Sequence, residues 1–209
     1  MKLTVIGATG PTGRLVVDQA LSAGHDLTVI ARRPDAVSSH PRLRVIAGSI
    51  DDTRALAEGM REAEAVISAL GTPGRTPTTV YSDGARALLD AMPDDGDCRI
   101  LAISAAPAAP PNFQTVTERL LLNPLMSLFF GGAFADMRRM EQTFITSDAP
   151  WTVFRPTRLT NSPATGAYRT AVDAPLKRPK PLARADLAAA LLAAITNDNY
   201  VRRSVAISG

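Results

Sequence analysis

The sequence predicts an α/β protein with a doubly wound, mainly parallel sheet and a few small elements near the C-terminus. Short runs rich in β-branched residues alternate with helical apolar patterns, which is the order that the right-handed crossovers of a parallel sheet produce. The first run, Lys2–Ile6, passes through a glycine-rich turn into an apolar stripe at 14–21. The chain has 209 residues, of which 45% are hydrophobic. That length and composition suit one domain over 1–209 with a substantial core.

The turn after the first strand has the sequence Gly7-Ala-Thr-Gly10-Pro-Thr-Gly13, with its three glycines at G-x-x-G-x-x-G spacing. Glycine permits left-handed torsions and lets a diphosphate lie on main-chain N–H groups with no Cβ in the way. The following helix directs its positive end at the same place. The alternative is a turn that only links a strand to a helix. Because strand and helix both flank the turn correctly, we expect it to bind a dinucleotide.

A second buried strand, Asp26–Ala31, ends in Arg32-Arg33-Pro34. This strand end follows the glycine turn at the distance where an acidic residue would hold the ribose 2′-OH of NAD, and an arginine the 2′-phosphate of NADP. Guanidinium groups suit a phosphate dianion, which a carboxylate would repel. Arg32 and Arg33 therefore predict NADP(H) as the cofactor.

Later strands of the pattern also deliver candidate ligand residues. After Leu43–Ala47 comes a loop in which Ser49 and Ile50 are expected to cover the adenine. Asp51 and Asp52 follow, and we interpret both as candidates to cap the next helix.

The run 64–70 brings Gly71 and Thr72 to the carboxyl edge of the sheet, beside the glycine turn. The strand Arg99–Ile103 ends at Ser104. Ligands of open α/β sheets bind along that edge. Ser104 is therefore expected to hydrogen-bond a nicotinamide or a substrate, the alternative being a residue that only forms a turn.

The stretch 112–133 is irregular and apolar, and glycines and prolines flank it. We interpret it as an apolar flap over the substrate, with a core-packed helix as the alternative. In the helix that follows Pro77, Tyr81 is expected to be partly exposed. The remaining expected elements are helices at 78–92, 136–147 and 184–196 and strands at 151–155, 167–172 and 201–207.

Composition narrows the function further. The net charge is only +3, too small for a nucleic-acid-binding surface. Cys98 is the one cysteine and His25 and His40 are the only histidines, so neither a disulfide nor a metal site is expected. Without a signal-like segment or a long apolar run, the sequence predicts a cytoplasmic protein with no membrane partner.

Charge is unevenly distributed along the chain. Residues 149–209 hold nine Lys and Arg against three Asp and Glu, whereas residues 1–148 carry an excess of acids. This basic third of the chain is either a solvated face or an electropositive wall for an anionic ligand.

The sequence resembles the atypical short-chain dehydrogenases/reductases with an N-terminal GATGxTG turn, and among them the NADPH-dependent flavin reductases that also reduce a bilin. The similar segments cover most of the chain: 7–13, 27–32, 70–72, 77–80, 84–86, 104–105, 165–168 and 185–187. The resemblance implies a Rossmann-type monomer, and a weak homodimer is the alternative. It also implies a cofactor site, to which we add Gly7 and Arg33 from the glycine turn and the end of the second strand. The complete predicted cofactor site is Gly7, Thr9, Gly10, Pro11, Thr12, Gly13, Arg32, Arg33, Ser49, Ile50, Leu70, Gly71, Thr72, Ser104 and Pro156.

Two departures from that group concern the substrate. The position of its active-site histidine, after the proline of the sixth strand, is Arg158 here. An anion-binding guanidinium thus stands where an imidazole is expected. The apolar segment 112–133 is also longer than the resemblance implies.

Typical short-chain dehydrogenases protonate an alkoxide through a Tyr-x-x-x-Lys pair. This chain lacks the pair, because Tyr81, Tyr168 and Tyr200 are followed four residues later by Ala, Val and Ser. A conjugated acceptor that spreads the charge of an added hydride needs no such acid. We therefore hypothesise an NADPH-dependent oxidoreductase for a planar acceptor such as a flavin, quinone or bilin, with catalytic roles for Ser104 and Arg158.

Two other functions stay open at this point. One is a regulatory protein that senses NADP(H) without turnover and docks a partner on the apolar surface at 120–130. The other is an NADP-dependent epimerase or isomerase, for which Asp136 and Glu141 are the available acid/base residues.

Overall fold

The computed structural model describes residues 1–72, 77–93, 97–110 and 123–209. Its main sheet has eight strands in the order β3-β2-β1-β4-β5-β6-β10-β8, and β8 alone runs antiparallel to its neighbour β10. Two short strands, β7 (Leu159–Thr160) and β9 (Leu182–Ala183), pair separately. The strands of the main sheet are β1 (Lys2–Ile6), β2 (Asp26–Ala31), β3 (Leu43–Ala47), β4 (Ala65–Ser68), β5 (Arg99–Ile103), β6 (Trp151–Pro156), β8 (Arg169–Val172) and β10 (Arg203–Ser208).

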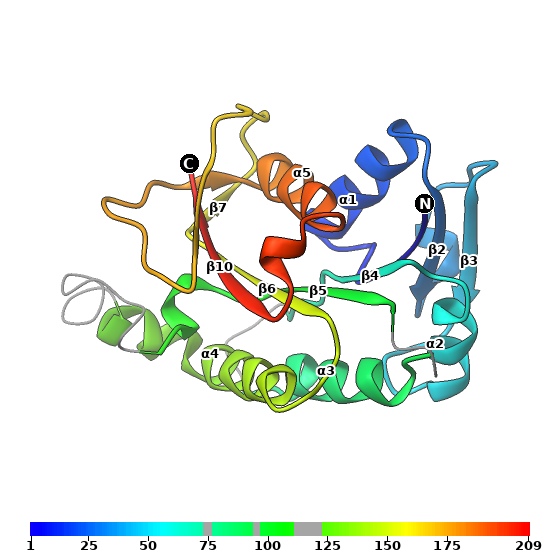
Figure 1. The fold of residues 1–209 in the computed structure, drawn as a ribbon, viewed down its shortest axis with the longest axis horizontal. Coiled ribbons are helices and arrows are strands. Elements are labelled where there is room, and N and C mark those ends of the chain that lie inside the picture. Colours follow the sequence, from blue (N-terminus) through cyan, green and yellow to red (C-terminus); the bar gives the residue numbers. More distant parts are fainter. Residues whose placement is uncertain (73–76, 94–96, 111–122) are drawn as a thin grey trace.

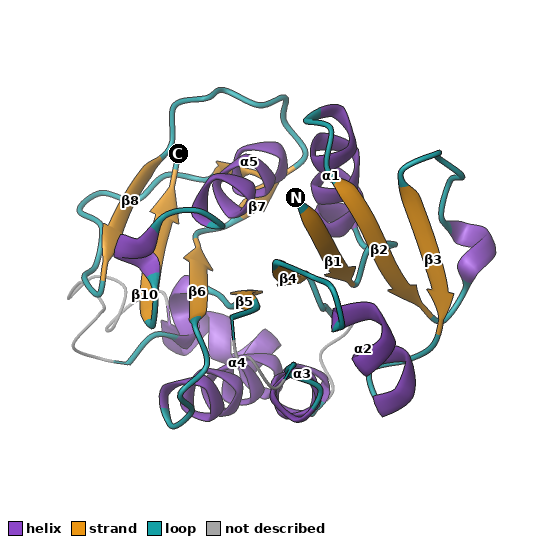
Figure 2. Cartoon of the chain, turned by 45° about the vertical axis from the view of Figure 1, so that its right-hand side comes forward, coloured by secondary structure: helices purple, strands orange, loops and turns teal. Residues whose placement is uncertain are grey.

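Helices cover both faces of this sheet (Figure 1). Helices α1 (Pro11–Ser22) and α5 (Arg184–Ala194) lie together on one face, and α2 (Thr53–Met60), α3 (Val80–Asp90) and α4 (Asn123–Ile145) lie on the other. Figure 2 shows the same layers from a second direction. The doubly wound α/β fold that the sequence predicts is therefore confirmed.

Strand β1 contributes to the core on both faces, because successive side chains of a strand point to opposite sides. Leu3 and Val5 pack in the core cluster that lies between the sheet, α1 and α5. Ile6 packs in the other cluster, beneath α2, α3 and α4. Thr4, on the same face as Ile6, donates its hydroxyl to the Gly59 carbonyl of α2 at 2.5 Å.

The order of the strands fixes where a ligand can bind. Strand β1 pairs with β2 on one side and with β4 on the other. The sheet therefore grows from β1 toward β2 and β3 on one side, and the later strands β4, β5 and β6 are added on the other side. In such a sheet a crevice opens at the carboxyl ends of the strands where the order reverses. The glycine turn after β1 and the residues after β4 border this place.

Some helix boundaries differ from the sequence predictions. Helix α1 begins at Pro11 rather than at residue 14, because proline suits the first helical position, where its missing N–H is not needed. Helix α4 begins at Asn123, so the part of the predicted flap at 123–133 is helical, and residues 112–122 lie outside the described residues. Tyr81 is buried, contrary to the expectation of partial exposure, because it lies on the inward face of α3 with Ala85 and Leu88.

Within the described ranges, no helix is both long and apolar enough to cross a membrane. No group of histidine, cysteine, aspartate and glutamate side chains with the composition of a metal site occurs in those ranges either.

Candidate functional site

The glycine turn is shaped by two close backbone approaches. Gly7 has φ +80°, and a Cβ on it would lie 2.4 Å from the carbonyl oxygen of Ala69, at the end of β4. A Cβ on Gly13 would lie 2.2 Å from the Gly7 carbonyl oxygen. Both distances are too short for any side chain. The turn can therefore close against β4 and against the start of α1 only with glycine at these two positions.

The N-terminus of α1 is open to an anion. Its N-cap is Gly10, and no side chain in the described residues caps this helix end. The turn is held from within, since the Gly10 N–H donates to the Gly7 carbonyl at 3.0 Å and the Arg14 side chain donates to the Thr9 carbonyl at 3.1 Å. Helix N-termini with unused N–H groups bind phosphate through those groups and through the helix dipole.

An apolar wall forms beside the turn from residues of three segments. Ile50 follows β3, Leu70 follows β4 and Gly84 lies in α3. A Cβ on Gly84 would lie 2.5 Å from Leu70 Cδ1 and 3.5 Å from Ile50 Cγ1, so the two aliphatic side chains meet over this glycine. Two predicted cofactor residues are thus brought together, in a place that suits the face of an adenine.

The loop around Ile50 leads into α2. Ser49 uses its hydroxyl locally, accepting from the Asp51 N–H at 3.3 Å. Asp52 caps α2 by accepting from the Ala55 N–H at 3.0 Å, which confirms capping for this residue.

Arg32 and Arg33 follow β2 at the carboxyl edge of the sheet, and both are exposed. Within the described residues neither guanidinium takes part in a hydrogen bond or an ion pair, although Asp35 lies close in sequence. Two cations that have no partner in the described part of the chain are thus available to a phosphate at the end of β2.

Ser104 is the most informative residue of the opposite side of the crevice. It directly follows β5, is only 3% exposed, and its N–H donates to the Phe154 carbonyl of β6 at 2.8 Å. Its hydroxyl is buried, yet it has no hydrogen-bond partner among the described residues. Buried hydroxyls are nearly always partnered in folded proteins, so this one is suited to a ligand atom.

Two further predicted site residues follow from β6. Pro156 is the last residue of this strand and is buried. Arg158 is exposed, and its carbonyl accepts from the Leu182 N–H at 3.0 Å. Gly71 and Thr72 lie beyond β4, where Gly71 is exposed and a Cβ on it would have no neighbour within 4 Å among the residues that the structure describes.

The structure engages both acid/base candidates of the isomerase alternative in other contacts. Asp136 on α4 is fully buried and accepts from the Tyr81 N–H at 2.8 Å and from the Ser82 hydroxyl at 2.5 Å, so it caps α3. Glu141 forms a buried ion pair with Arg155, with N–O distances of 3.1 and 2.6 Å. Both carboxylates hold helices in place.

Tyr81 is a residue near the site that sequence reasoning missed. Burial raises the pKa of its phenol, a hydrogen bond with the Thr72 backbone opposes this increase, and the Asp136 carboxylate adds to it. The hydrogen bond with Thr72 brings the Tyr81 phenol to the segment after β4. Its position in the first helical turn after that segment was the available signal.

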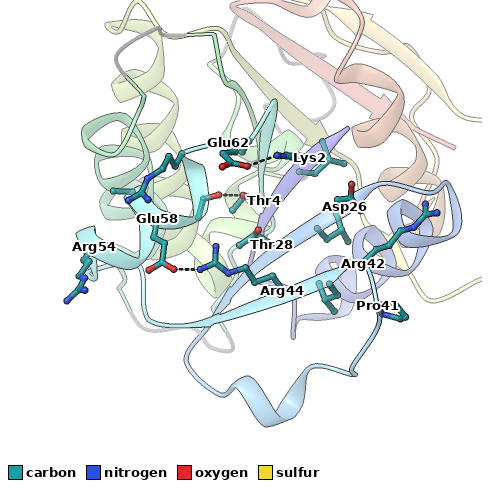
Figure 3. Close-up of a pocket in the computed structure, with 17 residues that line it drawn as sticks. Lys2, Thr4, Asp26, Thr28, Pro41, Arg42, Arg44, Arg54, Glu58 and Glu62 are labelled. Carbon is teal, nitrogen blue, oxygen red and sulfur yellow. Dashed lines mark hydrogen bonds and ion pairs between the residues drawn. The ribbon is translucent and has the colours of Figure 1, made fainter.

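A cavity of about 710 Å³ lies elsewhere, and Figure 3 shows its side chains. It is lined by the first residues of β1, β2 and β3 and by the last part of α2, so it opens at the amino ends of the strands. Several of its charges are paired there, as in the ion pairs Arg44–Glu58 and Lys2–Glu62. This cavity is therefore separate from the crevice at the carboxyl ends.

A protein-family model described as NAD(P)H-binding matches residues 7–198, which is most of the chain and includes the crevice just described. The chain belongs to this NAD(P)H-binding family. Its resemblance to the atypical short-chain dehydrogenases/reductases is confirmed at this level.

Two curated relatives match this chain over about half of its length. It is 35% identical to Rv2047c of Mycobacterium tuberculosis over 106 residues, which are 50% of this chain and 12% of that protein. It is 29% identical to YwnB of Bacillus subtilis over 107 residues, which are 51% of this chain and 48% of YwnB.

Several solved structures share the fold of this protein. The oxidoreductase ylbE of Lactococcus lactis aligns with a TM-score of 0.81 at 17% identity, over 100% of this chain and 91% of that one. A Streptococcus pneumoniae protein provisionally assigned as an NADH-flavin reductase gives a TM-score of 0.78 at 18% identity, covering 100% and 99%. A Veillonella parvula short-chain dehydrogenase/reductase in complex with NADP gives 0.77 at 18%, covering 100% and 94%. At these identities the likeness establishes the shared fold, while NAD(P)H binding rests on the family match over residues 7–198.

Proposed function

We propose that this protein is an NADPH-dependent reductase that transfers hydride to a planar conjugated acceptor such as a flavin, a quinone or a bilin. The observation that carries the proposal is the buried hydroxyl of Ser104 at the carboxyl edge of the sheet, which has no hydrogen-bond partner among the described residues. Ser104 follows β5 at the same sheet edge as the glycine turn, where family membership supports a bound dinucleotide.

The described residues fit the cofactor at three places. The uncapped start of α1 suits the pyrophosphate, and the meeting of Ile50 and Leu70 suits the adenine. Arg32 and Arg33 have no partner among the described residues and suit a 2′-phosphate, which supports NADPH over NADH. When bound, the cofactor would supply a hydride from C4 of its nicotinamide.

The chain's own residues orient the acceptor and contribute little acid/base chemistry. A tyrosine that protonates an alkoxide needs a lowered pKa, but burial raises the pKa of both Tyr81 and Tyr168. The proposed acceptor therefore takes its proton from water and its two electrons with the hydride, while NADPH is oxidised to NADP⁺. Ser104 would donate a hydrogen bond to the acceptor or to the carboxamide, and Arg158 would stabilise negative charge.

The contacts of Asp136 and Glu141 favour this reductase over an epimerase or isomerase. Each carboxylate is buried and already bonded to N–H or hydroxyl donors of neighbouring elements. Neither is free to exchange a proton with a substrate in this arrangement.

Rapid mixing of the purified protein with NADPH and FMN, riboflavin or a simple quinone tests the function. The expected result is loss of NADPH absorbance with at least one acceptor, at a rate above that of the mixture without protein. Calorimetry with NADP⁺ provides the second readout. Tight NADP⁺ binding without turnover of any acceptor would replace the reductase by the sensor alternative.

A further inference from the structure

A basic loop, residues 174–180, lies beyond the site described so far. Its sequence is Ala-Pro-Leu-Lys-Arg-Pro-Lys, and its three cations Lys177, Arg178 and Lys180 are all exposed. The loop contains no acidic residue. The exposed Arg158 belongs to the segment that contacts the end of this loop, because the Leu182 N–H donates to the Arg158 carbonyl at 3.0 Å.

The backbone of the basic loop is fixed by side chains from outside it. The Arg169 guanidinium donates to the carbonyls of Lys177 and Arg178, each at 3.1 Å. The Thr157 hydroxyl donates to the Lys180 carbonyl at 2.6 Å. Arg178 has φ +49°, which a residue other than glycine seldom adopts without such support. Three backbone carbonyls of the loop thus accept hydrogen bonds that hold it against the rest of the protein.

The charged side-chain groups of this region, in contrast, make no hydrogen bond or ion pair with the described residues. Among the described residues, no hydrogen bond or ion pair reaches the side chains of Lys177, Arg178, Lys180 or Arg158. The acid nearest in sequence, Asp173, is occupied by the Arg203 guanidinium at 2.9 Å and the Ser204 N–H at 3.0 Å. Within the described ranges these four positive charges have no acidic partner, so each of them is available to attract an anion.

The basic loop borders the segment that follows Ser104. Pro175, Leu176 and Pro179 of the loop line a cavity of about 20 Å³ together with Ala106 and Ala109. Ala106 is only two residues beyond Ser104. An acceptor that bonds the Ser104 hydroxyl would consequently bind near the basic loop.

We propose that the basic loop and Arg158 recognise a doubly charged anionic group, such as a phosphate monoester, on the planar acceptor. The inference rests on the proposed reductase function and deepens it, because it names the acceptor class: FMN rather than riboflavin. Lysine and arginine clusters favour phosphate dianions through several charge-assisted hydrogen bonds at once. The basic third of the chain is, on this view, an element of substrate selection.

The test compares FMN with riboflavin, which share the isoalloxazine ring and differ by the phosphate. With NADPH saturating, the wild-type KM for FMN is expected to be roughly tenfold lower than that for riboflavin. The double variant Lys177→Gln/Arg178→Gln is expected to raise the KM for FMN about tenfold and that for riboflavin less than twofold. The matched control Arg54→Gln/Arg61→Gln removes two cations that line the cavity at the amino ends of the strands, and it should change neither KM.

The outcomes separate the inference from the function on which it rests. Equal KM values for the two flavins, or equal increases in the double variant, would overturn recognition by the loop while leaving the reductase intact. If neither flavin is reduced, the function fails, and the quenching of FMN and riboflavin fluorescence by the NADP⁺-saturated protein still tests the loop. Tighter binding of FMN that the double variant abolishes would support it. If the double variant loses the binding of the wild-type protein to acidic lipid vesicles but keeps the wild-type affinity for FMN, the loop would be assigned to a membrane surface instead.

Discussion

Arg155 on β6 and Glu141 on α4 form a buried, two-pronged ion pair, with side chains that are each only 5% exposed. The pair joins the central sheet to the helix that also caps α3 through Asp136. It sits one residue before Pro156, so it also fixes the end of the strand that leads to Arg158. The carboxyl edge of the sheet and the stability of the fold are therefore connected at this contact.

Replacing Glu141 by leucine is expected to lower the free energy of unfolding by about 3–5 kcal/mol, because the Arg155 guanidinium then remains buried without its carboxylate. Urea denaturation measures the loss. The exposed pair of Arg203 and Asp173 supplies the comparison, since Arg203→Ala should cost no more than about 1 kcal/mol. Equal losses in the two variants would contradict the importance of burial at Glu141.

Ser104→Ala should reduce turnover without destabilising the protein. Its hydroxyl is buried and has no partner in the described structure, so removing it costs no protein hydrogen bond. A lost donor to the acceptor or carboxamide is expected to lower kcat by about tenfold to 100-fold. Thermal denaturation and steady-state NADPH oxidation check the two halves of this prediction. A destabilised variant with normal kcat would show that the hydroxyl has a structural role only.

Arg32→Gln and Arg33→Gln are each expected to weaken NADP⁺ binding by roughly tenfold, the value of one charge-assisted contact to phosphate. Affinity for NAD⁺ should stay within about twofold. Calorimetric titration with both dinucleotides measures the ratio. Arg61→Gln, at the far end of α2, is the charge-matched control and should leave both affinities unchanged. Parallel losses for NAD⁺ and NADP⁺ would argue against a 2′-phosphate site.

Gly13→Ala and Gly71→Ala should separate the fold from the cofactor. A Cβ on Gly13 would lie 2.2 Å from the Gly7 carbonyl oxygen, whereas one on Gly71 would meet no atom of the described residues within 4 Å. The first variant is expected to lose about 1–3 kcal/mol of stability together with cofactor binding. The second should keep its stability and weaken NADP⁺ binding only if Gly71 contacts the dinucleotide. Unchanged stability in Gly13→Ala would refute the close packing.

Tyr81 predicts a specific response to alkaline pH. Burial raises the pKa of its phenol above the ordinary value, so the unfolded chain loses this proton first as the pH rises. The stability from Tyr81 is therefore complete below about pH 10 and is lost as the pH rises through the raised pKa. Unfolding free energies measured from about pH 9 to about pH 11 should fall less steeply for Tyr81→Phe than for wild type. Identical slopes would contradict the burial of this phenol.

Local sequence pattern was sufficient for the strands β1, β2, β3 and β5, whose predicted and observed bounds coincide. It also gave the glycine turn and the capping of α2 by Asp52, because these depend on neighbours in sequence. Side-chain alternation and glycine spacing are encoded within a few residues. The class of fold and the NAD(P)H-binding family therefore followed from the chain alone.

Contacts between distant segments required the tertiary structure. Nothing near Asp136 or Glu141 in sequence indicates that one caps α3 and the other neutralises Arg155, and both were open as acid/base candidates until their partners were known. The inward face of Tyr81 and the missing partner of the Ser104 hydroxyl were equally hidden. The physical reason is that burial and hydrogen-bond satisfaction depend on which elements pack together in space, whereas the sequence records only which residues are adjacent along the chain.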